Sequence, residues 1–418
     1  MTSNALDSAY SAVTRDGVLR HADGATFAYL PAATVQSHAA NLQTLPDGRL
    51  ACVWFGGTQE GISDISVWFS ALESGSDRWS EPEQLSHDSA RSEQNPILFA
   101  PGGDEVWLVY TAQRAGNQDT AEVRRRISQD SGRTWAPAET LFAATEAGGV
   151  FVRHQPLILP SGRWLIPVFR CLTTPGEKWV GNNDDSAVMI SDDAGRTWRE
   201  QLIPGSQGCV HMDIQPLADG SLLALFRSRW ADAIYESRSE DDGATWTQPV
   251  PTELPNNNSS IQFTALADGR LALVYNHRRA EETTERRLSL YDEIDDDGLV
   301  EEGASPAQAA ADVEPSPPVG IRSAFWGTPR APMTLAISED SGRTWPVRRN
   351  LEVGDGYCLS NNSRDGLNRE YSYPSIHQGS DGELHIAYTY FRQAIKYVKV
   401  SPAWAYAGTT TPGGDTDA

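Results

Sequence analysis

The sequence predicts an all-β fold, a six-bladed β-propeller that forms one domain over about residues 26–402. Three observations carry this prediction: an octet that recurs four times, a turn signal that recurs six times, and the lack of long stretches with helical periodicity. Such repeats are typical of proteins in which one small sheet is copied around an axis.

The octet has the pattern Ser-x-Asp-x-Gly-x-Thr-Trp, which is typical of a hairpin turn. Its Asp can accept backbone N–H bonds, its Gly allows positive φ, and its Trp can pack the hairpin onto its own sheet. A degraded copy ends near Trp79. The four full copies are SQDSGRTW (Ser128–Trp135), SDDAGRTW (Ser191–Trp198), SEDDGATW (Ser239–Trp246) and SEDSGRTW (Ser338–Trp345).

The second repeated signal is a turn followed by an apolar strand. Each unit therefore reads as inner strand, turn, second strand, third strand, octet turn and fourth strand. The last interval between turns is about twice the others, so it holds either a surface insertion at 281–320, which we favour, or a seventh blade. The turn glycines are Gly48, Gly103, Gly162, Gly220, Gly269 and Gly382.

The two ends of the chain are predicted to differ in structure. The last blade, Tyr371–Val400, contains no octet, and the early strand Thr26–Pro31 is predicted to complete its sheet and close the ring. The C-terminal tail at about 405–418 is rich in Gly, Thr and Asp, and we expect it to be disordered.

Composition limits the partners. The net charge is −22, which argues against nucleic acid and against an anionic membrane surface. An anionic ligand would need a local cluster of arginines. The start of the chain lacks the pattern of a secretory signal, and its four cysteines are scattered singly, so we expect a cytoplasmic protein with buried, reduced thiols.

Six polar stretches open the six predicted inner strands, where a structural core strand should be apolar. In a propeller these openings meet at one end of the axis, so they predict a ligand site; a merely wet channel is the alternative. Among their residues we expect Gln94, Asn95, His154, Gln155 and Asn258 to bind substrate. The stretches are SHAAN (Ser37–Asn41), EQNP (Glu93–Pro96), VRHQP (Val152–Pro156), HMDIQP (His211–Pro216), NNNSS (Asn256–Ser260) and YSYP (Tyr371–Pro374).

Arginines near the ends of the second strands suit a carboxylate, because one guanidinium can donate two parallel charge-assisted hydrogen bonds to it. The candidates are Arg227, Arg229 and Arg392. Arg227 and Arg229 alternate with Ser228, so both should point to the same face. Solvated charges on the rim are the alternative.

The octet resembles the Asp box of the sialidase superfamily, and the resemblance covers nearly the whole chain. It implies a propeller in which the boxes lie away from the catalytic face. For a true exo-α-sialidase, DIQPLADGSLLALFRSR implies Asp213 as acidic partner with Arg227 or Arg229, and LVYNH followed by RRLSLY implies Arg287 or Arg286. YSYP implies Tyr371 or Tyr373 as nucleophile. The chain departs from that pattern at the first inner strand, where His38 replaces the first arginine of the family.

A second reading fits this departure better. The stretch SHAANLQTLPDGRLACVWFGGTQEGISDISVWFS resembles the predicted-neuraminidase branch, which includes rhamnose–glucuronate lyases. A uronate lyase needs a cation on the carboxylate, a base for the C5 proton and an acid for the leaving oxygen. The His, Tyr and Arg residues predicted at the axis meet these demands, and we expect Arg153 or Arg227 to bind the carboxylate, His38 or His211 to act as base, and Tyr373 to act as acid.

The favoured expectation is thus an enzyme that cleaves a terminal bond at an acidic sugar by β-elimination, with an acidic oligosaccharide as its partner. The exo-α-sialidase and a non-catalytic glycan-binding propeller are the alternatives. No metal-binding motif is visible, so no cofactor is expected, although a structural calcium ion held by backbone oxygens is left open.

Overall fold

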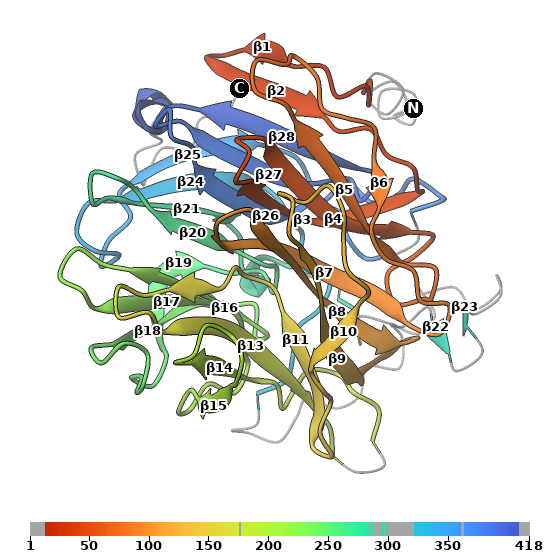
Figure 1. Ribbon diagram of the computed structural model, residues 1–418, viewed down its shortest axis with the longest axis vertical. Coiled ribbons are helices and arrows are strands. Elements are labelled where there is room, and N and C mark those ends of the chain that lie inside the picture. Colours follow the sequence, from red (N-terminus) through yellow and green to blue (C-terminus); the bar gives the residue numbers. More distant parts are fainter. Residues whose placement is uncertain are drawn as a thin grey trace.

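The computed structural model describes residues 13–174, 177–283, 286–287, 294–295, 298–299, 322–360 and 363–408. Six antiparallel sheets follow one another around a common axis, as Figure 1 shows. The prediction of six blades is confirmed, and the seven-bladed alternative is wrong, because the doubled turn interval contains one blade with an insertion.

The first three blades are continuous in sequence. Blade 1 contains β3 (Gln36–Thr44), β4 (Leu50–Gly57), β5 (Ser66–Leu72) and β6 (Glu83–Gln84). Blade 2 contains β7 (Ser92–Gly102), β8 (Glu105–Arg114), β9 (Asn117–Ser128) and β10 (Glu139–Phe142). Blade 3 contains β11 (Gly148–Val152), β12 (Leu157–Ile158), β13 (Trp164–Leu172), β14 (Asp185–Ser191) and β15 (Arg199–Leu202).

The other three blades complete the ring. Blade 4 contains β16 (Cys209–Pro216), β17 (Leu222–Ser228), β18 (Ala233–Ser239) and β19 (Val250–Pro255). Blade 5 contains β20 (Gln262–Ala265), β21 (Leu271–Asn276), β24 (Met333–Ser338) and β25 (Val347–Glu352). Blade 6 contains β26 (Tyr371–Gln378), β27 (Leu384–Tyr390), β28 (Ala394–Val400), β2 (Ala25–Tyr29) and β1 (Arg20–Ala22).

The ring closes in blade 6, where a strand from the start of the chain pairs with one from its end. Thr26 lies opposite Lys399 and Tyr29 opposite Lys396, so β2 is the fourth strand of the sheet. Figure 1 shows β2 and β28 side by side. The predicted closure by Thr26–Pro31 is confirmed, with β1 added at the outer edge.

The four octets, called Asp boxes below, are the turns between third and fourth strands. In each, the Ser Oγ accepts a bond from the Gly N–H at 2.8–2.9 Å, and the Thr hydroxyl donates to the Asp carboxylate at 2.6–2.7 Å. The glycines also dock on the preceding blade. A Cβ on Gly342 would lie 2.6 Å from a methyl of Leu223 in blade 4, so positive φ and close packing both require Gly here.

Apolar side chains fill the layers between neighbouring blades. Between blades 4 and 5, Leu223 and Leu225 of β17 pack with Leu271 and Leu273 of β21, and Trp345 of an Asp box completes the cluster. Each such buried side chain contributes roughly 1.5–3 kcal/mol by leaving water. The blades are therefore held to one another by ordinary hydrophobic packing, and the polar inner strands are left for other tasks.

Between β21 and β24 lies the predicted insertion. Its described parts include η1 (Ala280–Glu282), β22 (Ile294–Asp295) and β23 (Gly298–Leu299), the last two forming a small separate sheet. Most of 281–320 lies outside the described residues. The predicted tail begins as ordered chain, because η2 (Pro402–Gly408) extends past residue 405, and 409–418 lie outside the description. No helix in the described ranges is long and apolar enough to cross a bilayer.

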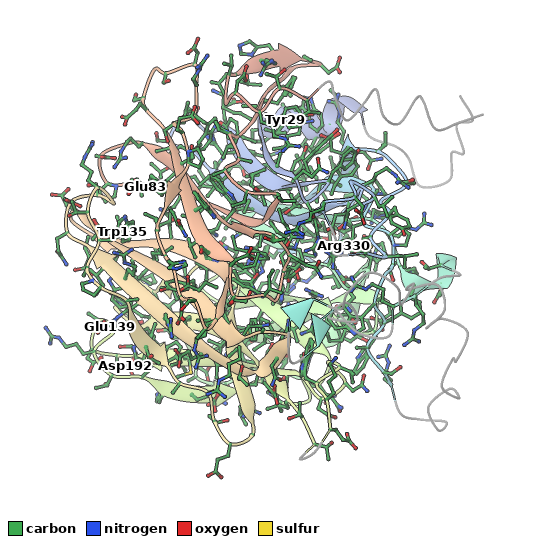
Figure 2. All side chains as sticks on the ribbon, turned by 90° about the vertical axis from the view of Figure 1, so that its right-hand side faces the viewer. Tyr29, Glu83, Trp135, Glu139, Asp192 and Arg330 are labelled. Carbon is green, nitrogen blue, oxygen red and sulfur yellow. The ribbon has the colours of Figure 1, made fainter. Side chains whose placement is uncertain are left out.

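The two faces of the disc differ. In Figure 2, Trp135 and Asp192, both in Asp boxes, lie toward the left-hand edge, whereas Arg330 lies to the right of them, away from that edge. The side opposite the Asp boxes is the one to search for a site.

Candidate functional site

The inner strands share a backbone distortion where their polar stretches lie. In five of the six blades one non-glycine residue of the stretch has φ between 49° and 61°. In blade 3 the inner strand is instead broken between β11 and β12, at residues 153–156. Non-glycine residues in this conformation cost of order 1–3 kcal/mol and cluster at functional sites. The five residues are Ala39, Asn95, His211, Asn258 and Tyr373.

Tyr373 of β26 lies at the centre of the cluster that results. Its ring centroid is 4.2 Å from that of His38 in β3 and 5.5 Å from that of His211 in β16. The guanidinium carbons of Arg153, Arg227 and Arg330 lie 5.4–5.6 Å from the same centroid. Residues from five blades, some of them more than 300 positions apart in the sequence, thus lie side by side. This is the arrangement expected if the inner-strand openings meet at one end of the propeller axis.

Arg227, near the end of β17, forms no ion pair with any described carboxylate. Its Nη1 donates to the Tyr373 hydroxyl at 2.6 Å and lies 3.3 Å from His211 Nε2, while its Nε donates to Asn258 Oδ1 at 2.8 Å. Its Nη2 finds no hydrogen-bond partner in the part of the chain that the structure describes, although the side chain is 1% exposed. Burial, together with the nearby charges of Arg229 and Arg330, lowers the Arg227 pKa to about 10. A buried guanidinium whose N–H groups are free binds an anion strongly, because it can donate charge-assisted hydrogen bonds to it.

Arg229 is on the same side of β17 but is already paired. Its guanidinium donates to the buried Asp184 carboxylate at 2.6 Å and 2.9 Å. Trp326 lies over both arginines, 5.8 Å from the Arg227 guanidinium carbon and 5.0 Å from that of Arg229. The expectation that the two arginines share a face agrees with this contact, and their partners give them different capacities for a ligand.

A four-residue charge network lies beside His38. Arg392, in the turn between β27 and β28, binds Glu60 at 2.5 Å and also Glu370, and Glu370 in turn binds Arg330 at 2.6 Å. All four side chains are buried. Arg330 and Arg392 outweigh the effect of burial and keep the Glu370 pKa below its usual range.

Sequence reasoning missed Arg330 and Glu370. The available signal was position, since Arg330 lies three residues before β24, the third strand of blade 5, and Glu370 directly precedes the polar opening of β26.

The histidines of the cluster are neutral. Burial and the surrounding arginines hold the pKa values of His38 and His211 well below 6.5, and burial and Arg153 do the same for His154. His38 Nδ1 bonds to the Thr389 hydroxyl at 2.8 Å, and its Nε2 has no partner. His211 Nδ1 and both ring nitrogens of His154 also lack partners. Neutral imidazoles with an unoccupied nitrogen can accept protons.

Asp213 does not accompany Tyr373. Its Oδ2 accepts the backbone N–H of Phe263 at 2.8 Å, which links blade 4 to blade 5, and burial raises its pKa to about 7. Similar links join other blades, for example from Leu98 N–H to Asn41 and from Ile376 N–H to Gln262. The residue of β16 that contacts Tyr373 is His211, so the expected acidic partner of the tyrosine is replaced by an imidazole.

Several other predicted residues lie beside the cluster or away from it. Tyr371 packs on Tyr390 and Phe391, and its hydroxyl donates to Val353 O at 3.3 Å, which leaves Tyr373 as the tyrosine of the site. The Gln94 amide donates to Ser92 at 2.9 Å, and the Asn95 Oδ1 has no partner.

The remaining two predicted residues belong to other parts of the fold. Gln155 donates across the axis to Leu42 O at 2.8 Å and to Leu98 O at 3.3 Å, in blades 1 and 2. Arg287 belongs to the insertion, where its N–H donates to Trp326 O at 3.0 Å.

The cluster is closed in this conformation. His38, His211, Arg227 and Tyr373 are at most 5% exposed. No group of three or more His, Cys, Asp or Glu side chains with metal-binding geometry occurs within the described ranges.

Comparisons with known proteins agree with the geometry of the fold. The profile of the BNR repeat-like domain matches residues 48–386. The Hadza microbial sialidase Hz136 has a similar structure at 12% identity and a TM-score of 0.62, over 88% of this chain and 66% of that chain.

Two trans-sialidase structures are also similar. The leech intramolecular trans-sialidase complexed with 2,7-anhydro-Neu5Ac matches at 14% identity and a TM-score of 0.64, over 97% of this chain and 73% of that chain. The intramolecular trans-sialidase from Ruminococcus gnavus matches at 14% identity and 0.62, over 90% and 96%. No curated protein matches the sequence. Identities this low show the fold alone, a sialidase-like propeller. The family profile covers most of the sequence, and the chain therefore belongs to the BNR repeat-like domain family.

Proposed function

We propose that this protein is a carbohydrate-active enzyme that cleaves a terminal bond at a uronate by β-elimination. The observation that carries the proposal is the surroundings of Tyr373: two neutral histidines and an arginine with a free N–H edge. A tyrosine that acts as a nucleophile needs a carboxylate base, and no carboxylate among the described residues is hydrogen-bonded to its hydroxyl.

The proposed step assigns one role to each group. Arg227 Nη2 holds the uronate carboxylate and stabilises the charge that develops when C5 loses its proton. His38 Nε2 takes that proton, with His38 Nδ1 donating to Thr389. The C5–H electron pair forms the C4=C5 double bond, and the C4–O bond breaks. Tyr373, whose oxygen already accepts from Arg227, donates its proton to the leaving oxygen.

Product analysis tests the proposal. The protein is incubated with a rhamnosyl-glucuronate oligosaccharide, and an unsaturated uronate, which absorbs in the ultraviolet, is the expected product. His38→Gln should lower kcat by about 100-fold, in the range of general base catalysis. His385→Gln is a matched control, because His385 binds Tyr397 and Asp381 in blade 6, outside the Tyr373 cluster, and should leave activity unchanged. Full activity in the His38 variant would remove it from the scheme.

An exo-α-sialidase is the second candidate. It is favoured by the sialidase names of the structural neighbours and by the place of Tyr373 on the inner strand of the last blade. Release of free sialic acid from a fluorogenic sialoside, with no unsaturated product from uronates, would favour it over the lyase. Tight glycan binding without either product would point to a non-catalytic propeller.

A further inference from the structure

Bulges in β3 and β26 leave backbone carbonyls without sheet partners. In β3 the pairing with β4 skips Ala39 and Ala40, and in β26 the pairing with β27 skips Tyr373 and Pro374. These bulges bring His38 and Tyr373 ring to ring. A buried carbonyl that finds no donor costs about 1–3 kcal/mol, so the arrangement needs donors from elsewhere.

Arg153 supplies those donors from the opposite side of the ring. It follows β11 in blade 3, where the inner strand is broken, and it is 1% exposed. Its Nη2 donates to Ala40 O at 3.1 Å, to Tyr373 O at 3.1 Å and to Pro374 O at 3.0 Å. Its Nε donates to Ser260 Oγ at 3.1 Å. One guanidinium therefore joins blades 1 and 6 through the two bulges and blade 5 through Ser260.

We propose that Arg153 is a positioning residue that holds the bulges of His38 and Tyr373 in register, and that it does not bind the substrate's carboxylate. The proposal rests on the proposed function for its catalytic consequence. Arg227 differs in the decisive respect: its Nη2 is free, whereas Arg153 Nη2 is surrounded by three carbonyl oxygens. A carboxylate placed at that edge of Arg153 would meet those oxygens and be repelled.

Steady-state kinetics of Arg153→Met and Arg153→Lys test the role. Displacing a reacting group by about 1 Å can cost about 100-fold, so Arg153→Met should lower kcat by about that factor with KM nearly unchanged. Arg153→Lys should be intermediate, because an ammonium can still donate to the carbonyls but cannot also reach Ser260. Glucuronate, an acidic ligand without a sugar leaving group, should bind wild type and both variants with similar Kd.

Amide hydrogen exchange gives a readout that does not depend on activity. Arg153→Met should speed exchange in peptides covering β3 and β26 by about tenfold, with the Asp-box peptides unchanged. Gln155→Leu is the matched control, because Gln155 also crosses the axis from blade 3 but bonds to blades 1 and 2, so exchange in β26 should stay as in wild type.

Opposite results overturn the proposal. A Met variant that binds glucuronate more than tenfold more weakly, with unchanged exchange in β26, would place Arg153 on the ligand. If wild type shows no lyase activity but the exchange pattern appears, the positioning role stands and the proposed function fails. If activity is present and neither exchange nor kcat changes in the Met variant, the positioning role fails alone.

Discussion

The Asp boxes and the inner-strand bulges both repeat around the ring, but their hydrogen bonds differ in kind. In an Asp box the Ser, Asp and Thr side chains bond to one another and to backbone within eight residues, as in Ser338–Trp345. At the bulges the bonds join different blades, as between Arg153 and Pro374. Several polar atoms there, including His38 Nε2, Arg227 Nη2 and His211 Nδ1, have no partner.

The difference separates what builds the fold from what can bind a ligand. A box whose polar groups are satisfied locally costs little to bury and offers nothing to a substrate. Buried polar groups without partners cost stability, so their concentration at one end of the axis is the physical mark of a site prepared for polar contacts. Variants test this contrast when a residue with unpartnered donors or acceptors is compared with a residue whose hydrogen-bonding groups all have partners.

The largest effect is expected from Arg227 of β17 and from Arg229, which directly follows that strand. Arg227→Gln should raise the Kd for glucuronate by about 100-fold, because it removes about 3 kcal/mol of charge-assisted hydrogen bonding. It should cost only about 1–3 kcal/mol of unfolding free energy, because Asn258 Oδ1 and the Tyr373 hydroxyl lose a donor but no carboxylate loses a partner. Arg229→Gln should instead cost about 3–5 kcal/mol of stability, because Asp184 would be left buried and unpaired.

Isothermal titration and chemical denaturation of the two variants separate these outcomes. The contrast fails if Arg227→Gln unfolds the protein while keeping its affinity for glucuronate. It also fails if Arg229→Gln loses affinity without any loss of stability, since Arg229 would then be the ligand-binding cation.

The fold was predictable because its signals are local. The octets and the glycine turns each specify a turn within a few residues, and they appear in the structure as expected. The early strand Thr26–Pro31 pairs with the far end of the chain, and it was predictable because the last blade lacked an octet hairpin and so needed another strand. The insertion was located by the doubled interval. The contact between Trp326, which follows the insertion, and Arg227 was not predictable, because it depends on where the long connection folds back onto the propeller.

The proximity of several candidate residues was predictable, whereas their hydrogen-bond partners were not. Polar openings of inner strands identified His38, His211 and Tyr373, which do meet. The hydrogen-bond partners of these residues could not be derived from the sequence. Asp213 accepts a bond from a backbone N–H of the next blade, and Arg153 donates to backbone carbonyls of blades 1 and 6. Such assignments depend on bulges that shift the register by single residues, and periodicity does not reveal them.

The buried histidines predict a loss of stability in mild acid. Burial lowers the pKa of His154 in the folded protein well below 6.5, so below pH 6.5 the histidine is protonated in the unfolded chain but not in the folded one. Proton binding then favours the unfolded state, and the free energy of unfolding falls as the pH falls below 6.5. Each such histidine lowers the free energy of unfolding by about 1.4 kcal/mol for every pH unit below 6.5, as long as the pH stays above its folded pKa. His154→Gln should therefore gain about 2 kcal/mol relative to wild type between pH 8 and pH 5.

Denaturant unfolding at the two pH values measures that double difference. A difference that does not change with pH would show that His154 takes up a proton in the folded state, against the burial that lowers its pKa. An Asp-box variant such as Ser338→Ala is the control, since a hydroxyl does not titrate in this range and its effect should be the same at both pH values.

The smallest effect is expected at the Asp box itself. Ser338 is fully buried, and its Oγ accepts the Gly342 N–H and donates to Asp340. Ser338→Ala leaves that N–H without a partner and should cost about 1–2 kcal/mol of unfolding free energy. Because all its bonds lie within one hairpin on the far side from Arg330, glucuronate affinity and kcat should not change. A catalytic defect in a fully folded Ser338→Ala protein would mean that the boxes and the axis are energetically coupled, and the separation between fold-building and ligand-binding hydrogen bonds would not hold.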